Sequence, residues 1–121
     1  MKRILAILSL TTLMGCSTIA EYWPTPHDPA LAQGWTTVQQ NLLRVKCDDK
    51  SDISGWLALT DSTQHLRIYA EFRSDNQVKT AQGLDDGVRK AYDTKNATVC
   101  NHNLKLAQTR LDILKKVWGT R

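Results

Sequence analysis

Cysteine is the residue type with the most informative chemistry in this sequence, which holds three of them. Residues 13–16 read LMGC and look like a lipobox, the motif in which a cysteine thiol receives diacylglycerol and the chain is cut just before it. We expect Cys16 to carry a covalent lipid as the first residue of the mature chain. Two or three acyl chains would hold the protein stably at a membrane, whereas one chain binds only marginally. Ser17 stands where an Asp would favour the inner membrane, so we expect the periplasmic face of the outer membrane.

The segment before Cys16 has the features of a secretory signal. Lys2 and Arg3 precede an apolar run from Ile4 to Leu8, which is the order of the charged and hydrophobic signal regions. The run is clearly shorter than the roughly 20 residues that a spanning helix needs. The 106 residues that follow suffice for one small domain but not for two. We therefore divide the chain into a removed signal peptide, a proline-containing lipidated tether and one helical domain: 1–15, 16–28 and 29–121.

The other two cysteines are suited to a disulfide. With Cys16 acylated, Cys47 and Cys100 are the only thiols left in an exported chain, and such a pair normally closes in an oxidising compartment. The bond would close a loop of about 53 residues and stabilise the domain by about 4 kcal/mol on the chain-entropy model. A metal or redox pair is the competing interpretation, but neither CxxC spacing nor clustered histidines favour it. We predict a structural disulfide between Cys47 and Cys100.

No set of side chains in the sequence resembles a catalytic or metal site. His27, His65 and His102 are far apart in the sequence, and none has a partner at metal-ligand spacing. The acidic cluster at 48–52 lacks the glycine and the closing glutamate of a calcium loop. Loss of two basic residues with the leader leaves 14 basic against 12 acidic residues, which removes the main reason to expect nucleic-acid binding. We expect a protein that is not an enzyme and has no metal and no cofactor beyond its covalent lipid.

In two segments the apolar residues are spaced as they are along one face of an amphipathic helix. Asp28 can cap the first one, Pro29 suits its first position, and the helix should end near Lys46. Its apolar residues recur at steps of four and three: Leu31, Trp35, Val38, Leu42 and Val45. The last helix has the same rhythm: Cys100, Leu104, Ala107, Leu111, Leu114 and Trp118. Gly119 and a basic last turn fit the end of this second helix.

The middle of the chain is less regular. Residues 77–92 fit a third helix, although Gly83 and Gly87 each cost about 1 kcal/mol there unless a close neighbour needs the space. Segment 56–72 fits either a helix or a β-hairpin, because the apolar residues in 66–72 alternate with polar ones while some also recur at helical steps. We favour the helix. The expected fold is all-α, a small four-helix bundle-like domain with one disulfide, and the alternative is an α+β domain with a hairpin around 56–72.

Around its two remaining cysteines the sequence resembles the all-helical pilotins of type II secretion systems, the PulS/OutS-type family. Four features carry the resemblance: the lipobox at Cys16, a first helix running into 42–47 (LLRVKC), a polar turn at 51–53 (SDI), and 100–104 (CNHNL). Members of that family are small outer-membrane lipoproteins with a four-helix fold and one disulfide. They bind the disordered C-terminal segment of a secretin, which folds into a helix in an apolar groove. The lipoprotein-sorting machinery then carries the secretin to the outer membrane.

The resemblance implies that this chain is a chaperone and targeting lipoprotein whose partner is a secretin C-terminal peptide. Coupled folding and helix-in-groove docking would be its physical basis. The groove walls would come from apolar positions of the first, third and last helices: Trp35, Leu42, Val88, Leu111 and Leu114. Four tryptophans in so small a chain add to the expectation of a groove. The alternative is an inhibitor or exclusion-type lipoprotein that binds a folded partner through loops at 48–52 or 60–64.

Overall fold

The computed structural model describes residues 28–119, and this part of the chain folds into four α-helices. They are α2 (Pro29–Arg44), α3 (Ile53–Phe72), α4 (Val78–Asp93) and α5 (Ala97–Trp118), with no strand among the described residues. The all-α prediction is confirmed. The hairpin alternative around 56–72 is wrong, since that segment is the interior of α3, and 60–64 is helical rather than a loop. The expected signal peptide, Cys16 and the tether up to residue 27 lie outside the described residues.

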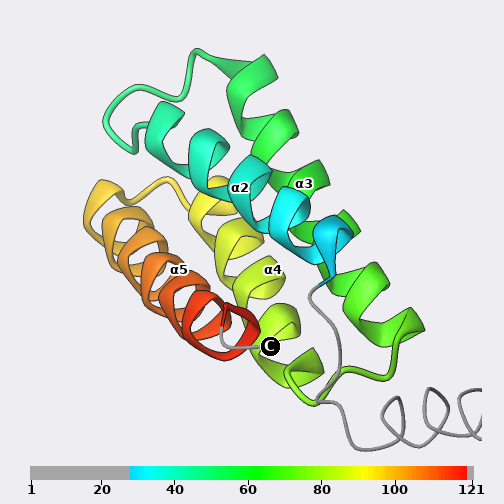
Figure 1. The fold of residues 1–121 in the computed structure, drawn as a ribbon. Coiled ribbons are helices and arrows are strands. Elements are labelled where there is room, and N and C mark those ends of the chain that lie inside the picture. Colours follow the sequence, from blue (N-terminus) through cyan, green and yellow to red (C-terminus); the bar gives the residue numbers. More distant parts are fainter. Residues whose placement is uncertain (1–27, 120–121) are drawn as a thin grey trace, which may run out of the picture.

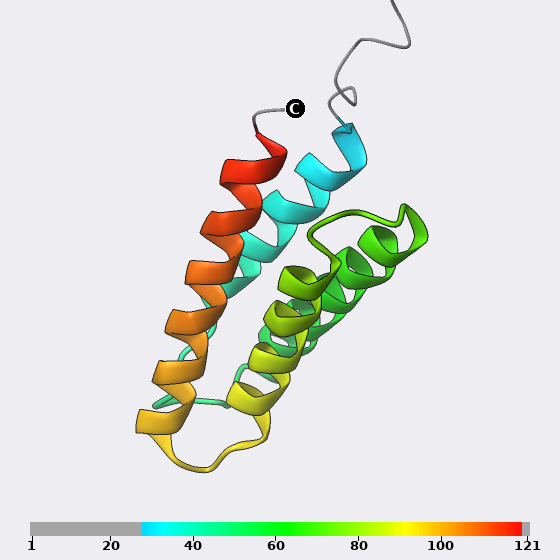
Figure 2. The same cartoon turned by 90° about the horizontal axis from the view of Figure 1, so that it is seen from below.

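The helices pack side by side as an antiparallel bundle (Figure 1). α2 packs on α3, α3 on α4, and α4 on α5, while contacts between α2 and α5 close the bundle. Figure 2 shows the same arrangement from below, with successive helices joined by short connections. Short connections favour antiparallel neighbours in helical bundles. The most extensive of these four contacts is between α4 and α5, and the least extensive is between α2 and α5.

Polar side chains cap the helices at their first residues. Asp28 and Asp52 cap α2 and α3, and each carboxylate accepts a hydrogen bond from a backbone N–H two or three positions on. Pro29 occupies the first position of α2, where its missing N–H has no helical partner to lose. The Asp28 cap and the place of Pro29 were predicted from the sequence and are confirmed. Asn96 caps α5 through two such bonds of 2.9 and 3.2 Å, so α5 begins at Ala97, slightly earlier than its apolar rhythm indicated.

Apolar side chains from all four helices fill the interior of the bundle. The largest core residues are almost completely shielded from solvent: Leu31, Val38, Trp56, Leu59, Leu66, Leu84, Val88, Leu111, Leu114 and Trp118. Trp56 lies against Tyr92, with ring centroids 5.5 Å apart. Burial of each such side chain stabilises the fold by about 1.5–3 kcal/mol. One continuous core therefore holds the four helices together.

The predicted disulfide is present. Cys47, just after α2, is bonded to Cys100 in the first turn of α5, with the two Cα atoms 5.7 Å apart. In the same connection, Lys50 donates to backbone carbonyls at the end of α4, including that of Ala91 at 2.8 Å. A cation is favourable there because the last carbonyls of a helix lack helical partners. The connection 45–52 is thus held to both α4 and α5.

The two glycines of α4 make room for an arginine of α5. A Cβ added at Gly83 would lie 3.0 Å from Nε of Arg110, and one added at Gly87 would lie 3.0 Å from its Nη1. The Nη1 group donates a 2.9 Å hydrogen bond to the carbonyl of Gly83. The expectation that glycine is tolerated in this helix only for a close neighbour is therefore confirmed, and the neighbour is Arg110.

Candidate functional site

Four of the five residues predicted to line a groove are buried in the core of the described bundle. Val88, Leu111 and Leu114 have no exposed surface, and Leu42 is buried as well. Trp35 is half-buried, and its indole Nε1 donates a 2.7 Å hydrogen bond to the carbonyl of Leu111. The groove assignment needs correction for the described structure, because helical periodicity points these residues toward the bundle axis. Periodicity identifies an apolar face, but it does not say whether a neighbouring helix or a partner covers that face.

Polar side chains bridge α2 and α5 near Trp35 and Leu111. Gln39 and Gln108 donate to each other through their side-chain amides at 2.9 and 2.8 Å. Lys115 holds its ammonium 5.5 Å from the centroid of the Trp35 ring, which is within cation–π range. Polar contacts therefore contribute to the boundary between α2 and α5, which is the least extensive of the four helix boundaries.

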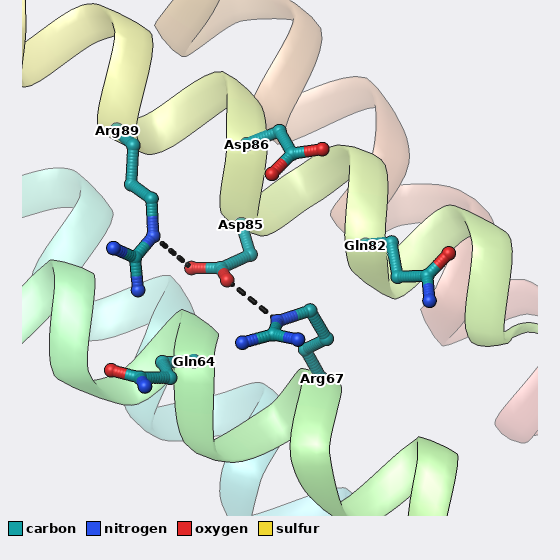
Figure 3. A pocket seen from close by; sticks show the side chains of 6 residues that line it. All are labelled: Gln64, Arg67, Gln82, Asp85, Asp86 and Arg89. Carbon is teal, nitrogen blue, oxygen red and sulfur yellow. Dashed lines mark hydrogen bonds and ion pairs between the residues drawn. The ribbon is translucent and has the colours of Figure 1, made fainter.

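An open depression of about 550 Å³ lies between α3 and α4. Its lining is entirely polar: Gln64, Arg67, Gln82, Asp85, Asp86 and Arg89. Figure 3 shows Arg67 and Arg89 reaching toward Asp85 from opposite sides, while Asp86 points away from the pair. None of these residues was predicted as a site from the sequence.

Asp85 is the buried centre of this cluster. Its carboxylate accepts hydrogen bonds from Nε of Arg67 at 2.7 Å, from the Thr63 hydroxyl at 3.0 Å and from Nε of Arg89 at 3.3 Å. Arg67 also bonds Glu71 one turn further along α3, at 3.1 Å. The Asp85 carboxylate, assisted by Glu71, raises the pKa of the Arg67 guanidinium above its ordinary value. A buried carboxylate needs such compensation, because an unpaired charge in the interior is costly.

The chemistry available in the depression is ionic and structural. It contains no hydroxyl, thiol or imidazole that could act as a nucleophile or base, and its one buried carboxylate is already fully paired. The cluster ties α3 to α4. His65 and His102 are exposed on separate helices, and residues 28–119 contain no group of three or more His, Cys, Asp or Glu side chains that could hold a metal. His27 lies outside the described residues.

The exposed apolar side chains form the other unusual surface feature. On α3 they lie on the side opposite the core, at Ile53, Leu57, Ile68 and Phe72. On α5 they are Val99, Leu106 and Ile113, each seven residues from the next and 36–44% exposed. We call these sets the α3 stripe and the α5 stripe. Leu43, near the end of α2, is an isolated exposed leucine.

Comparisons with protein-family models, with curated proteins and with solved structures gave no match to this chain. Within residues 28–119, none of the helices combines the length and the apolar character that crossing a membrane requires.

The α5 stripe was missed in the sequence, although a signal for it exists. The predicted rhythm of α5 followed the core residues, whereas Val99, Leu106 and Ile113 recur at an exact heptad on a different face. An interval of seven residues is two helical turns, so the three side chains lie nearly in line along the helix. A search for a second apolar stripe on each helix finds this line of residues.

Proposed function

We propose that the protein is a lipid-anchored adaptor of the pilotin type, which is not an enzyme. It would bind the C-terminal segment of a secretin and carry it to the outer membrane through lipoprotein sorting. The observation that carries this proposal is the α5 stripe. An unpartnered line of apolar residues on a straight helix fits an amphipathic segment that folds as it binds.

Geometry favours α5 as the docking face. The helix spans Ala97–Trp118, which is about 33 Å at 1.5 Å per residue, long enough to contact several turns of a partner helix. Val99, Leu106 and Ile113 would supply contacts at one end, the centre and the other end. Because the disulfide holds the start of α5 and the core holds its inner face, the stripe is presented rigidly. Because this surface is already rigid, only the partner segment has to lose conformational entropy when the two bind.

The charges beside the α5 stripe favour an acidic partner segment. On α5, no side chain three or four positions from a stripe residue is acidic. Lys116 is a basic neighbour of Ile113, and Arg110, whose guanidinium packs against α4, adds positive charge on the other side of Ile113 and beside Leu106. The expected ligand is therefore a helix with apolar residues on one face and Asp or Glu beside them. Charge complementarity of this kind sets orientation and association rate more than affinity.

The test is a titration of labelled secretin C-terminal peptides with the purified mature protein, followed by fluorescence anisotropy. Leu106→Glu places a carboxylate at the centre of the α5 stripe without touching the core. We expect it to weaken binding by at least about tenfold, which corresponds to about 1.4 kcal/mol. Circular dichroism should show peptide helicity rising on addition of the wild-type protein.

Leu57→Glu is the matched control, since it makes the same change at a half-exposed leucine of the α3 stripe. We expect this variant to bind the peptide as the wild type does. Equal losses in both variants, or a loss only in Leu57→Glu, would contradict docking on α5. If the wild-type protein binds no secretin peptide at all, the pilotin proposal itself fails.

A further inference from the structure

The end of α3 carries the most exposed large apolar side chain among the described residues. Phe72 is 83% exposed, and Ile68, one turn earlier on the same stripe, is 50% exposed. At this exposure, no other helix of residues 28–119 covers the Phe72 ring. Its charged neighbours are already paired, because Glu71 bonds Arg67 and Arg73 forms an ion pair with Asp28.

The backbone turns sharply just after Phe72 and leaves it at the tip of the helix. Ser74 adopts a φ of 50°, and its N–H bonds the carbonyl of Glu71. The N–H of Asp75 reaches back to the carbonyl of Ala70, which completes a Schellman-type helix end. This tight reversal sends the chain into α4, and Figure 1 shows the last turn of α3, which Phe72 ends, at one end of the bundle.

The N-terminal segment joins the bundle at the same end. Asp28 is the first described residue, and its carboxylate accepts a 3.1 Å hydrogen bond from the Tyr69 hydroxyl as well as pairing with Arg73. Both partners belong to the last turn and cap of α3, next to Phe72. Eleven residues lie between Cys16 and Asp28, and the twelve residue steps that join them span at most about 40 Å when fully extended.

We propose that this end of the bundle faces the bilayer and that Phe72, with Ile68, inserts into the headgroup region of the membrane that holds the lipid on Cys16. The inference rests on the lipid anchor in the proposed function. The connecting segment holds the domain within about 40 Å of the bilayer, so even a weak insertion becomes effectively intramolecular. Aromatic rings are favoured at this depth because the interface accommodates amphipathic and apolar groups together. The sides of the bundle, including the α5 stripe, remain open to a protein partner.

The experiment uses the full chain, expressed so that it is processed and lipidated, and reconstituted into vesicles of phosphatidylethanolamine and phosphatidylglycerol. Phe72→Cys supplies one free thiol, since Cys47 and Cys100 are disulfide-bonded and Cys16 would be acylated. The thiol is labelled with an environment-sensitive fluorophore, and quenching by brominated lipids is measured. Leu43→Cys is the matched control, because Leu43 is 77% exposed but lies at the opposite end of α2 from Asp28.

We expect several-fold stronger lipid quenching and a blue-shifted emission at position 72 compared with position 43. Flotation of the vesicles, with a Cys16→Ala variant for comparison, tests the anchor separately. Protein that floats but shows no lipid quenching at position 72 would overturn the insertion while leaving the anchor intact. Protection of position 72 from aqueous iodide without lipid quenching would mean that protein covers Phe72, which also overturns the proposal. A wild-type chain that does not float would overturn both inferences.

Discussion

Ser74 is the only non-glycine residue with a positive φ among residues 28–119, and it shows how one position closes a helix. A residue with a Cβ in the left-handed region is disfavoured by about 1 kcal/mol relative to glycine. We expect Ser74→Gly to raise the free energy of unfolding by up to about 1 kcal/mol, measured by urea denaturation. Ser74→Ala, which keeps the Cβ, should show no such gain. An equal effect of the two substitutions would mean that the backbone conformation is not the cause.

Asp85 is the residue whose loss should be most damaging outside the apolar core. Asp85→Asn keeps the shape but removes the charge that pairs with Arg67 and Arg89. We expect the free energy of unfolding to fall by about 2 kcal/mol, below the range for fully buried pairs because both arginines are partly exposed. Asp86→Asn changes the adjacent exposed carboxylate and should stay within about 0.5 kcal/mol of wild type. Similar urea midpoints for the two variants would rule out a structural role for the cluster.

Asp52 should make stability depend on pH in the acid range. The side-chain hydrogen bond from Arg44 and the backbone N–H of Gly55 lower the pKa of Asp52 below its ordinary value of 3.8. Since the folded-state pKa is the lower one, the stabilisation is present above about pH 4 and is lost as the pH falls through the folded-state value. Asp52→Asn should therefore flatten the loss of stability between neutral and strongly acidic pH. Arg44→Ala, which removes the main cause of the shift, should have a similar effect in thermal melts across that range.

At the scale of the element, Gly83 and Arg110 offer a test of how α4 packs on α5. Alanine in place of glycine should gain about 1 kcal/mol of helix propensity, but its Cβ would meet Arg110 at 3.0 Å. We expect Gly83→Ala alone to bring no gain in the free energy of unfolding. In an Arg110→Ala background the same change should bring the full gain. Additive effects in this double-mutant cycle would show that the two positions are independent.

The elements themselves were largely predictable from the sequence. Asp28 with Pro29 marked the start of α2, and the four-three rhythm marked α5, because one apolar face and a capping residue agreed in each case. α3 was ambiguous for a physical reason. Ile68 and Phe72 are exposed on the face opposite to Leu66 and Ala70, so apolar residues occur on both sides of the helix and mimic the alternation of a strand.

The candidate site was much less predictable than the fold. Leu111 and Leu114 were expected in a groove and lie in the core, whereas Leu106 and Ile113 lie on the surface of the same helix. A sequence shows that all four are apolar and how they are spaced. Which apolar face is covered depends on how the other helices pack against it, and the spacing of residues within one helix does not reveal this. The Asp85 cluster was missed for the same reason, because Asp85 lies on α4 and the Thr63 hydroxyl that bonds it lies on α3.

At the scale of the whole molecule, the four boundaries between neighbouring helices differ in how much contact they make. The boundary between α2 and α5 is the least extensive of the four, and its contacts include the bond from Trp35 to Leu111, the Gln39–Gln108 pair and the disulfide near the ends of these helices. The covalent bond thus reinforces the least extensive of the four helix boundaries. It also connects two segments that are distant in sequence, which is where a cross-link restricts the unfolded chain most.

The last prediction concerns that bond. A link that closes about 53 residues stabilises a domain by about 4 kcal/mol in the chain-entropy model. A loss of this size should lower the melting temperature by roughly 15–30 °C in a domain of this length. We expect thermal melts followed by circular dichroism to shift accordingly when the wild-type protein is reduced. A variant with both Cys47→Ser and Cys100→Ser should melt at the lower temperature with or without reductant. A reduced wild type that melts at the oxidised temperature would mean that the polar contacts between α2 and α5 already hold the bundle closed, and that the disulfide contributes little to its stability.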